Sequence, residues 1–157
     1  MVTAFLLEYG RRGTLKKFIT KVDNVTLLRW MVQVAKGLRD MHQVGIIHGD
    51  LKPENVIIME SGRAKIIDLA QSGYTIPYRA PEFPDLFESK GEWHCSVDIY
   101  SFGVVYWRML FGTADELPQP DDQHSSPVIK LITECVSTNP LERPSAQHVI
   151  DTLEHRS

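Results

Sequence analysis

The sequence is poor in cysteine, with only Cys95 and Cys135 among its 157 residues. They lie far apart and neither belongs to a Cys-x-x-Cys pair, so neither a disulfide framework nor a zinc site is indicated. His94 stands beside Cys95, but no further clustered ligands accompany these two residues. A reducing compartment, the cytoplasm, is therefore expected.

Long apolar runs are also missing. The longest, residues 99–111, is too short to span a bilayer and contains Arg108, so we predict a buried core helix there. Residues 1–7 are apolar, yet they lead into Glu8 without a basic leader or a small-residue cleavage site, which argues against a signal peptide. No association with a membrane is expected.

Neither sign of charge dominates the sequence. It has 17 basic and 20 acidic residues, interspersed along the chain, and a formal net charge of −3. This balance gives no reason to expect nucleic acid or an anionic membrane as a partner. With 43% hydrophobic residues, the chain is expected to form one globular domain around a single core.

Four helices are predicted from apolar periodicity. The clearest begins after Asp23 and Asn24, and residues 97–110 form a second that is apolar almost all round and stops at Gly112. Ser145 is predicted to cap the last helix. The apolar positions of the first helix are Leu27, Leu28, Met31, Val34, Ala35, Leu38 and Met41. Those of the two final helices are Val128, Leu131, Ile132, Cys135 and Val136, and then Ala146, Val149, Ile150 and Leu153.

Strand signals are short and few. Residues 2–7 and residues 45–47 are β-rich runs, and residues 56–67 contain two such runs around a Ser-Gly turn signal, which predicts a hairpin. Residues 117–127 are rich in Pro, Asp and Ser and are predicted to form a surface loop. The expected fold is therefore mainly α with small β-hairpins.

One polar segment indicates chemistry. Residues 48–55, HGDLKPEN, place Asp50, Lys52 and Asn55 on a single loop between short strands. Asp68 ends the second strand of the predicted hairpin, so a hairpin of this length brings Asn55 and Asp68 together. Mg²⁺ takes oxygen ligands from one or two protein groups together with substrate phosphates, and this pair could supply them.

These residues resemble those of the eukaryotic-type protein kinase family. Residues 48–55 match the catalytic loop His-Arg-Asp-Leu-x-x-x-x-Asn, residues 68–70 stand where Asp-Phe-Gly is expected, and residues 80–82 are Ala-Pro-Glu. Each triplet alone is weak, but their order and spacing together are specific. The resemblance covers nearly the whole chain and implies a kinase-like α+β C-terminal lobe at residues 11–157, preceded by the last strand and hinge of the N-terminal lobe at residues 1–10.

The resemblance implies a catalytic set. Asp50 would accept the proton of the substrate hydroxyl, Lys52 would neutralise the transferring phosphoryl group, and Thr75 would bridge the two. Asn55 and Asp68 would hold Mg²⁺. Lys52 and the segment around Thr75 resemble those of serine/threonine rather than tyrosine kinases.

The resemblance also implies an ATP site and two structural interactions. The backbones of Glu8 and Gly10 would face adenine, and Ile57 would form the floor beneath it, although Ile57 serves equally well as a core residue. The two structural interactions involve charged residues. The resemblance implies a buried ion pair between Glu82 and Arg143. It also implies that the acid Asp98 holds the backbone of the catalytic loop.

The sequence departs from the family at several points. It contains no Gly-rich loop, no strand lysine for the α and β phosphates and no helix glutamate to pair with that lysine. Gly49 replaces the arginine that normally pairs with an activation-loop phosphate, and Ala70 replaces a glycine. The chain by itself is therefore expected to be inactive, without a phosphate switch.

Three hypotheses remain open at this point. The first is a serine/threonine kinase with ATP and Mg²⁺ as cofactors and a protein substrate, active in a longer product or with an N-terminal lobe supplied in trans. The second is a pseudokinase-like module that binds a partner protein through the uncovered upper face of the lobe. The third is a truncated product with no role of its own.

Overall fold

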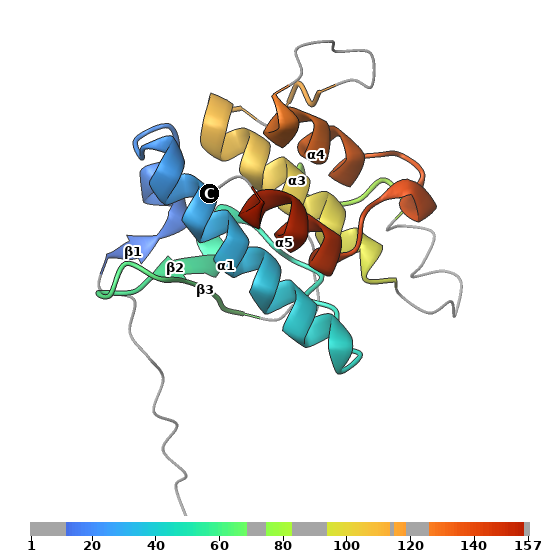
Figure 1. The fold of residues 1–157 in the computed structure, drawn as a ribbon, viewed down its shortest axis with the longest axis horizontal. Helices are drawn as coiled ribbons and strands as arrows, with labels where there is room; N and C mark the ends of the chain where they lie inside the picture. The colour runs from blue at the N-terminus through green and yellow to red at the C-terminus, as the bar shows by residue number, and fades with distance from the viewer. Residues whose placement is uncertain (1–11, 69–74, 83–93, 114, 119–125, 156–157) are drawn as a thin grey trace, which may run out of the picture.

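The computed structural model describes residues 12–68, 75–82, 94–113, 115–118 and 126–155. The predictions for the strand at residues 2–7 and for Glu8, Gly10 and Ala70 lie outside these residues. A small antiparallel sheet, in the order β1-β2-β3, packs at one edge of a group of helices (Figure 1). The long helix α1 contacts both β3 and α5, while α3 contacts α1 and α4. This arrangement confirms a helix-rich fold with a small sheet.

Helix α1 spans Asn24–Gln43 and begins just before the predicted start, since it includes Asn24. The carboxylate of Asp23 caps it by accepting a hydrogen bond of 2.9 Å from the backbone N–H of Thr26. The buried face of α1 consists of Leu27, Trp30, Met31, Val34, Ala35 and Leu38. The helix also holds the hairpin, because Trp30 donates its indole N–H to the carbonyl of Gly62 and Gln33 accepts from the backbone of Ala64.

The predicted hairpin is confirmed as β2 (Val56–Ile58) and β3 (Ala64–Ile66), with Ile57 paired to Lys65. Sequence analysis missed β1 (Gly13–Thr14), a two-residue strand that pairs with β2. The prediction of β structure at residues 45–47 was wrong. The backbone N–H of Ile46 bonds back to the end of α1 at Met41, so this run completes the helix terminus.

Helix α3 spans Ser96–Phe111 and is buried almost all round. It ends as predicted at Gly112, whose φ of 80° allows its N–H to bond the carbonyl of Arg108 at 2.8 Å. Within α3, a Cβ at Gly103 would come within 2.8 Å of Cys135 and Val136. The glycine therefore lets α3 and α4 approach closely.

The last two helices are α4 (Pro127–Cys135) and α5 (Ala146–Glu154). Ser145 caps α5 as predicted, since its hydroxyl accepts from the N–H of His148 at 3.2 Å. The short helices η1 (Leu15–Phe18), η2 (Pro53–Asn55) and η3 (Pro140–Glu142) connect the main elements. Of the predicted loop at residues 117–127, Pro127 belongs to α4 and residues 119–125 lie outside the described part.

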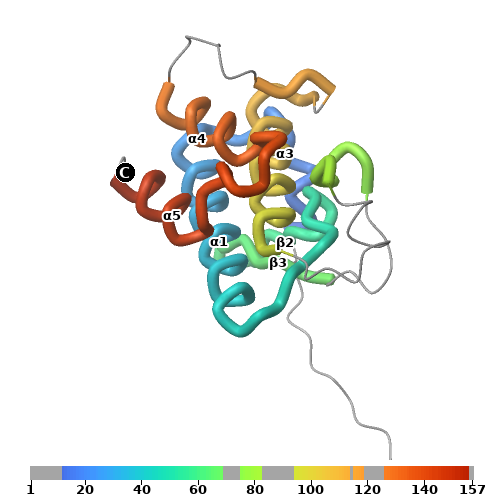
Figure 2. Tube along the Cα trace, turned by 90° about the vertical axis from the view of Figure 1, so that its right-hand side faces the viewer, coloured from blue at the N-terminus to red at the C-terminus, as the bar shows by residue number. Residues whose placement is uncertain are grey.

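The segment of residues 75–82 lies on the opposite side of α3 from α4 (Figure 2). Residues 44–55, which follow α1, also lie beside α3 (Figure 2). Among the helices of the described residues, none combines the length and hydrophobicity that crossing a membrane requires.

Candidate active site

The loop after α1 is fixed by a carboxylate from α3. Asp98 is fully buried and accepts hydrogen bonds from the backbone N–H groups of His48 and Gly49, each at 2.8 Å. It also accepts from Nε2 of His42 at 2.8 Å. Three donors thus compensate one buried charge, which would otherwise be costly. The predicted role of Asp98 in holding this loop agrees with this geometry.

Gly49 gives the loop its turn. Its φ of 79° lies in the left-handed region, where glycine carries no steric penalty. The turn places the following residue, Asp50, opposite the segment that contains Thr75.

His48 links the two halves of the site. Its Nδ1 accepts from the backbone N–H of Asp50 at 3.2 Å, and its Nε2 lies 2.9 Å from the carbonyl oxygen of Ile67. A backbone N–H can only donate and a carbonyl can only accept, so the hydrogen-bond network assigns a neutral ring protonated at Nε2. The buried imidazole therefore connects the residue before Asp68 to the backbone of Asp50.

Asp50, Lys52 and Thr75 meet as a triangle. Lys52 donates from Nζ to the hydroxyl of Thr75 at 2.7 Å, and that hydroxyl donates to Oδ1 of Asp50 at 2.9 Å. The third side is an ion pair of 3.1 Å between Lys52 Nζ and Asp50 Oδ2. All three side chains are partly accessible, so an acceptor hydroxyl could reach the carboxylate.

Asn55 and Asp68 lie at the adjoining end of the hairpin. The buried Asn55 donates its side-chain N–H to the carbonyl of Asp50 at 2.8 Å, which leaves its amide oxygen as an acceptor. Its own carbonyl accepts from the N–H of Ile67 at 2.9 Å, so the backbones beside Asn55 and Asp68 are joined. The Asp68 side chain is exposed, and its residue has a φ of 54°, which aspartate tolerates better than most residues. An amide oxygen and a carboxylate are ligands that fit Mg²⁺.

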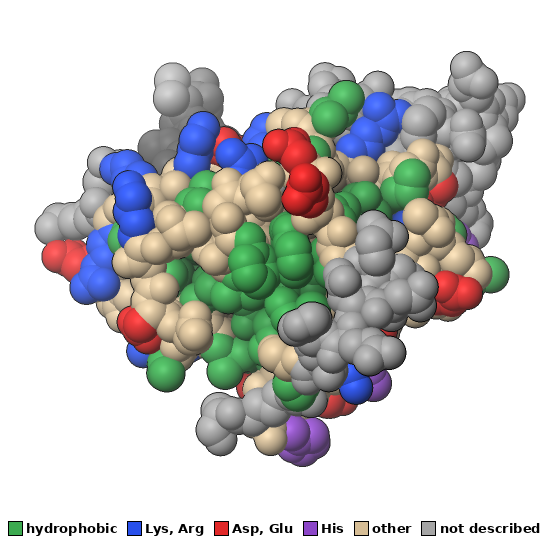
Figure 3. Space-filling model, turned by 90° about the horizontal axis from the view of Figure 1, so that it is seen from above, with side chains coloured by type: hydrophobic (Ala, Val, Ile, Leu, Met, Phe, Trp, Pro, Cys, Tyr) green, Lys and Arg blue, Asp and Glu red, His purple; other side chains and the backbone are tan. Residues whose placement is uncertain are grey.

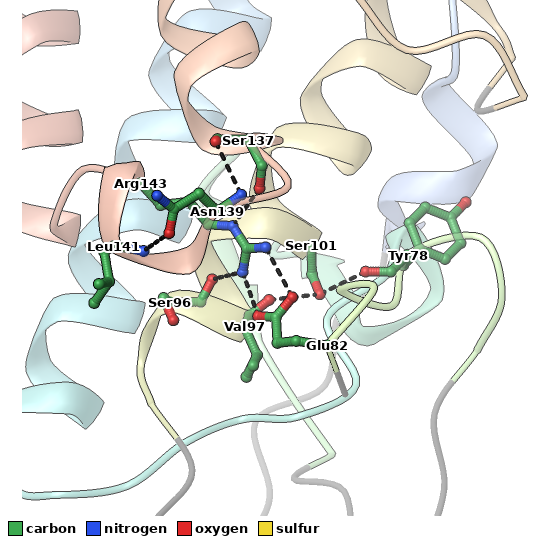
Figure 4. Close-up of polar contacts among 9 residues, drawn as sticks. All are labelled: Tyr78, Glu82, Ser96, Val97, Ser101, Ser137, Asn139, Leu141 and Arg143. Atoms are coloured by element: carbon green, nitrogen blue, oxygen red, sulfur yellow. Dashed lines mark hydrogen bonds and ion pairs between the residues drawn. The ribbon is translucent and has the colours of Figure 1, made fainter. Parts of the chain in front are cut away.

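The segment after Thr75 is tied to the helices by Arg143. Its guanidinium donates to the two carboxylate oxygens of Glu82 at 2.6 and 2.8 Å, to the carbonyl of Ser137 at 2.8 Å and to that of Ser96 at 3.1 Å (Figure 4). The Arg143 side chain is fully buried, and its guanidinium carbon lies 5.0 Å from the ring centre of Tyr100. The predicted ion pair of Glu82 and Arg143 is present, with the arginine buried and the Glu82 side chain 21% exposed.

Ile57 lies in β2 and is half-buried between its strand neighbours Thr14 and Lys65. Its proposed place beneath adenine stays a prediction, as do those of Glu8 and Gly10, which lie outside the described residues.

Comparison with known proteins gives the family. A model of the protein kinase domain matches residues 2–153. The chain belongs to the protein kinase family.

Its curated relatives are also kinases. The chain is 26% identical to the serine/threonine/tyrosine-protein kinase HT1 of Arabidopsis thaliana, over 98% of this chain and 47% of the relative. It is 33% identical to the mitogen-activated protein kinase mpkC of Aspergillus terreus, over 81% of this chain and 37% of the relative. This kinase chain thus spans less than half the length of these two relatives.

Several residues around the candidate site escaped the sequence reasoning. Ser101 donates to the carbonyl of Tyr78 at 2.7 Å, and the Tyr78 hydroxyl accepts from Arg108, which also lies 5.6 Å from the tyrosine ring centre. Burial raises the pKa of Tyr78, although the nearby charge of Arg108 opposes this shift. His42 was missed as well, because its position in α1 looks like any polar residue on a helix surface.

Proposed function

We propose that this chain carries the catalytic and metal-binding residues of a cytoplasmic serine/threonine protein kinase, and that it transfers phosphate only when an N-terminal lobe completes it. The observation that carries the proposal is the triangle of Asp50, Lys52 and Thr75, with both oxygens of one carboxylate facing a lysine and a hydroxyl. Membership of the protein kinase family supports it.

In this proposal Asp50 is the base. It accepts the proton of the acceptor serine or threonine hydroxyl as that oxygen bonds to phosphorus and the bond from phosphorus to the ADP oxygen breaks. Lys52 holds positive charge beside the transferring group, and Thr75 keeps the lysine and the carboxylate in register through its two hydrogen bonds.

Asn55 and Asp68 are the residues proposed to hold Mg²⁺, and Ile57, Glu8 and Gly10 are proposed to contact adenine. Bound Mg·ATP would supply the phosphoryl group and the divalent charge. The sequence contains no Gly-rich loop and no strand lysine for the phosphates, so we propose that the isolated chain binds Mg·ATP with a dissociation constant of roughly a millimolar or more.

The proposal is tested by phosphorylation of serine and threonine peptides, using the chain with an N-terminal lobe of a related kinase or within a longer natural form. Asp50→Asn should abolish transfer while its urea denaturation curve stays close to that of the wild type, because asparagine keeps the shape but cannot accept the proton. The matched control is Asp40→Asn, at an exposed carboxylate of α1 that bonds Arg39. Activity that survives Asp50→Asn, or labelling of tyrosine alone, would contradict the proposal.

A second candidate is a pseudokinase-like module that binds a partner protein. It is favoured by exposed apolar surface, since hydrophobic side chains gather in the middle of the face that lies at the top of Figure 1 (Figure 3). This face lies at the end of the molecule with α4, away from the hairpin, so it is not the upper face that the sequence hypothesis named. Separately, Ile76 in the segment of residues 75–82 is 76% exposed, and Phe111 at the end of α3 is 52% exposed. Titration calorimetry with Mg·ATP, on the chain completed by an N-terminal lobe, separates the kinase from the binding module. Micromolar binding that Asp68→Ala abolishes is expected only of the kinase.

A further inference from the structure

Arg108 is a cation of α3 without a carboxylate partner. It donates to the hydroxyl of Tyr78, and its guanidinium carbon lies 5.6 Å from the centre of that ring. Its Nε is buried without an acceptor, and within the described part of the chain no aspartate or glutamate pairs with it. The residue as a whole is only half-buried. A guanidinium with an unused buried donor favours a ligand that supplies an acceptor.

Tyr78 connects Arg108 to the proposed base. The backbone N–H of Tyr78 bonds the carbonyl of Thr75 at 2.9 Å, so these two residues are the ends of one tight turn. Thr75 donates to Asp50 at one end, and Tyr78 accepts from Arg108 at the other. The ends of such a turn lie less than about 7 Å apart at their Cα atoms. An extended peptide advances about 3.3 Å per residue, so a side chain within about four positions of an acceptor at Asp50 would lie near Arg108.

A second group of cations lies beside the same end of α3. Residues 15–22, LKKFITKV, contain no acidic residue and three exposed lysines. The N–H of Thr20 bonds the carbonyl of Met109 at 3.1 Å, and η1 contacts η2. This segment therefore lies between the residue that follows Arg108 and the loop of the candidate site. Its lysines are Lys16, Lys17 and Lys21.

The charges at this edge do not cancel. Lys16 pairs with Glu54 at 2.8 Å, and Lys52 pairs with Asp50 at 3.1 Å. The other two lysines of residues 15–22 and Arg108 have no carboxylate partner among the described residues. Since the whole chain has a formal net charge of −3, the excess of positive charge is local to this edge. Such an edge attracts anions.

Glu54 is the rival feature. Its Oε1 faces Lys16, but its Oε2 is buried without a hydrogen-bond partner and would favour a cation. One half-satisfied carboxylate stands against three cations without a carboxylate partner, so the balance favours an anionic ligand.

We propose that Arg108, together with the lysines of residues 15–22, forms a subsite for an anionic side chain of the protein substrate. The anion is a carboxylate or a phosphate that lies within about four residues of the acceptor hydroxyl. A planar guanidinium binds either anion through two parallel N–H groups. The inference rests on the proposed kinase function, because it names the substrate class of that site.

The test uses the chain completed by an N-terminal lobe of a related kinase. Serine peptides carry alanine, aspartate, phosphoserine or arginine at each position within about four residues of the acceptor. At the position that reaches Arg108, aspartate or phosphoserine should raise kcat/KM about tenfold over alanine, mainly by lowering KM. Comparison of these two peptides identifies the anion that binds better.

Variants assign the preference to the residue. Arg108→Gln should remove it, and Arg108→Glu should reverse it in favour of arginine. The matched control is Lys130→Glu, at an exposed lysine of α4, which should keep the wild-type preference. If Arg108→Glu does not fold, the result for Arg108→Gln still decides.

An active wild type without a preference for acidic peptides would overturn the subsite, as would a preference that survives Arg108→Gln. A preference for arginine would also overturn it and would assign the position to Glu54. If no peptide is phosphorylated, the proposed function is contradicted, and NMR of the chain itself decides the subsite. A peptide with alanine at the acceptor and aspartates around it should then shift the Nε–H signal of Arg108, and an unchanged signal would overturn the subsite as well.

Discussion

The two sides of α3 are held by different forces. Toward α4, contact is apolar and close, with Gly103 against Cys135 and Val136. Toward the candidate active site, α3 instead offers polar side chains: Asp98 binds two backbone N–H groups and Ser101 binds the carbonyl of Tyr78.

The difference follows from the partners of α3. The backbone N–H and C=O groups of a helix are hydrogen-bonded within the helix itself. The contact between α3 and α4 therefore depends on close packing of apolar surfaces. Residues 44–52 and 75–82 contain no helix or strand, so their backbone groups need partners from elsewhere. Buried polar side chains of α3 supply these partners. The positions of these two segments therefore depend on a few side chains rather than on regular secondary structure.

The largest effect is expected on the polar side. Asp98→Ala should lower the free energy of unfolding by about 3–5 kcal/mol, because it leaves buried donors of the loop and His42 without their acceptor. Urea denaturation measures this. Asp40→Ala, at an exposed carboxylate, should stay within about 0.5 kcal/mol of the wild type. Equal losses of stability in the two variants would contradict the claim that the buried carboxylate of Asp98 holds the loop.

The apolar side can be tested by adding a single carbon. Gly103→Ala should lower the free energy of unfolding by about 1–3 kcal/mol. The new Cβ would come within 2.8 Å of Cys135, the last residue of α4, and of Val136, which follows it. Gly37→Ala is the matched helical control. There the Cβ would meet only the tip of the Ile66 side chain at 3.1 Å, and the gain in helix propensity offsets the contact. A Gly103 variant as stable as the Gly37 variant would show that α3 and α4 pack loosely.

A smaller effect is expected at the helix caps. Ser145→Ala should cost about 1 kcal/mol, because the hydroxyl accepts from the N–H of His148 at the start of α5. Ser126→Ala, at the start of α4, removes a serine that makes no capping hydrogen bond and should cost less. Thermal and urea unfolding of both variants give the difference. If the Ser126 variant proves the less stable, local capping does not explain where α5 begins.

The sequence predicts elements with strong local signals well and long-range polar contacts poorly. Helix α1 could be predicted from Asp23 and its apolar stripe, and the end of α3 from Gly112, because cap and periodicity are local. Strand β1 could not, since two residues pair only because β2 lies beside them. The run at residues 45–47 looked like a strand by composition, yet the end of α1 takes its backbone bond.

The residues of the candidate site also differ in how far local sequence predicts them. Asp50, Lys52 and Asn55 could be proposed from sequence because they lie within six residues of one another, and Asp68 because it ends the predicted hairpin. Thr75, Asp98 and the pair of Glu82 and Arg143 followed from resemblance to the family, since no local pattern marks them. The link from His42 to Asp98 joins distant segments through one hydrogen bond, and only the folded chain reveals it.

The most direct test of the polar account is a double-mutant cycle on Glu82 and Arg143, with the pair of Lys36 and Glu154 as control. Arg143→Ala should cost about 3–5 kcal/mol, because the buried guanidinium binds both oxygens of Glu82 and two backbone carbonyls. Chemical denaturation of the wild type, both single variants and the double variant should give a coupling energy above about 1 kcal/mol. The exposed pair of Lys36 and Glu154 should give about 0.5 kcal/mol or less. A coupling near zero for Glu82 and Arg143 would contradict the claim that polar contacts of the helices hold residues 75–82 in place.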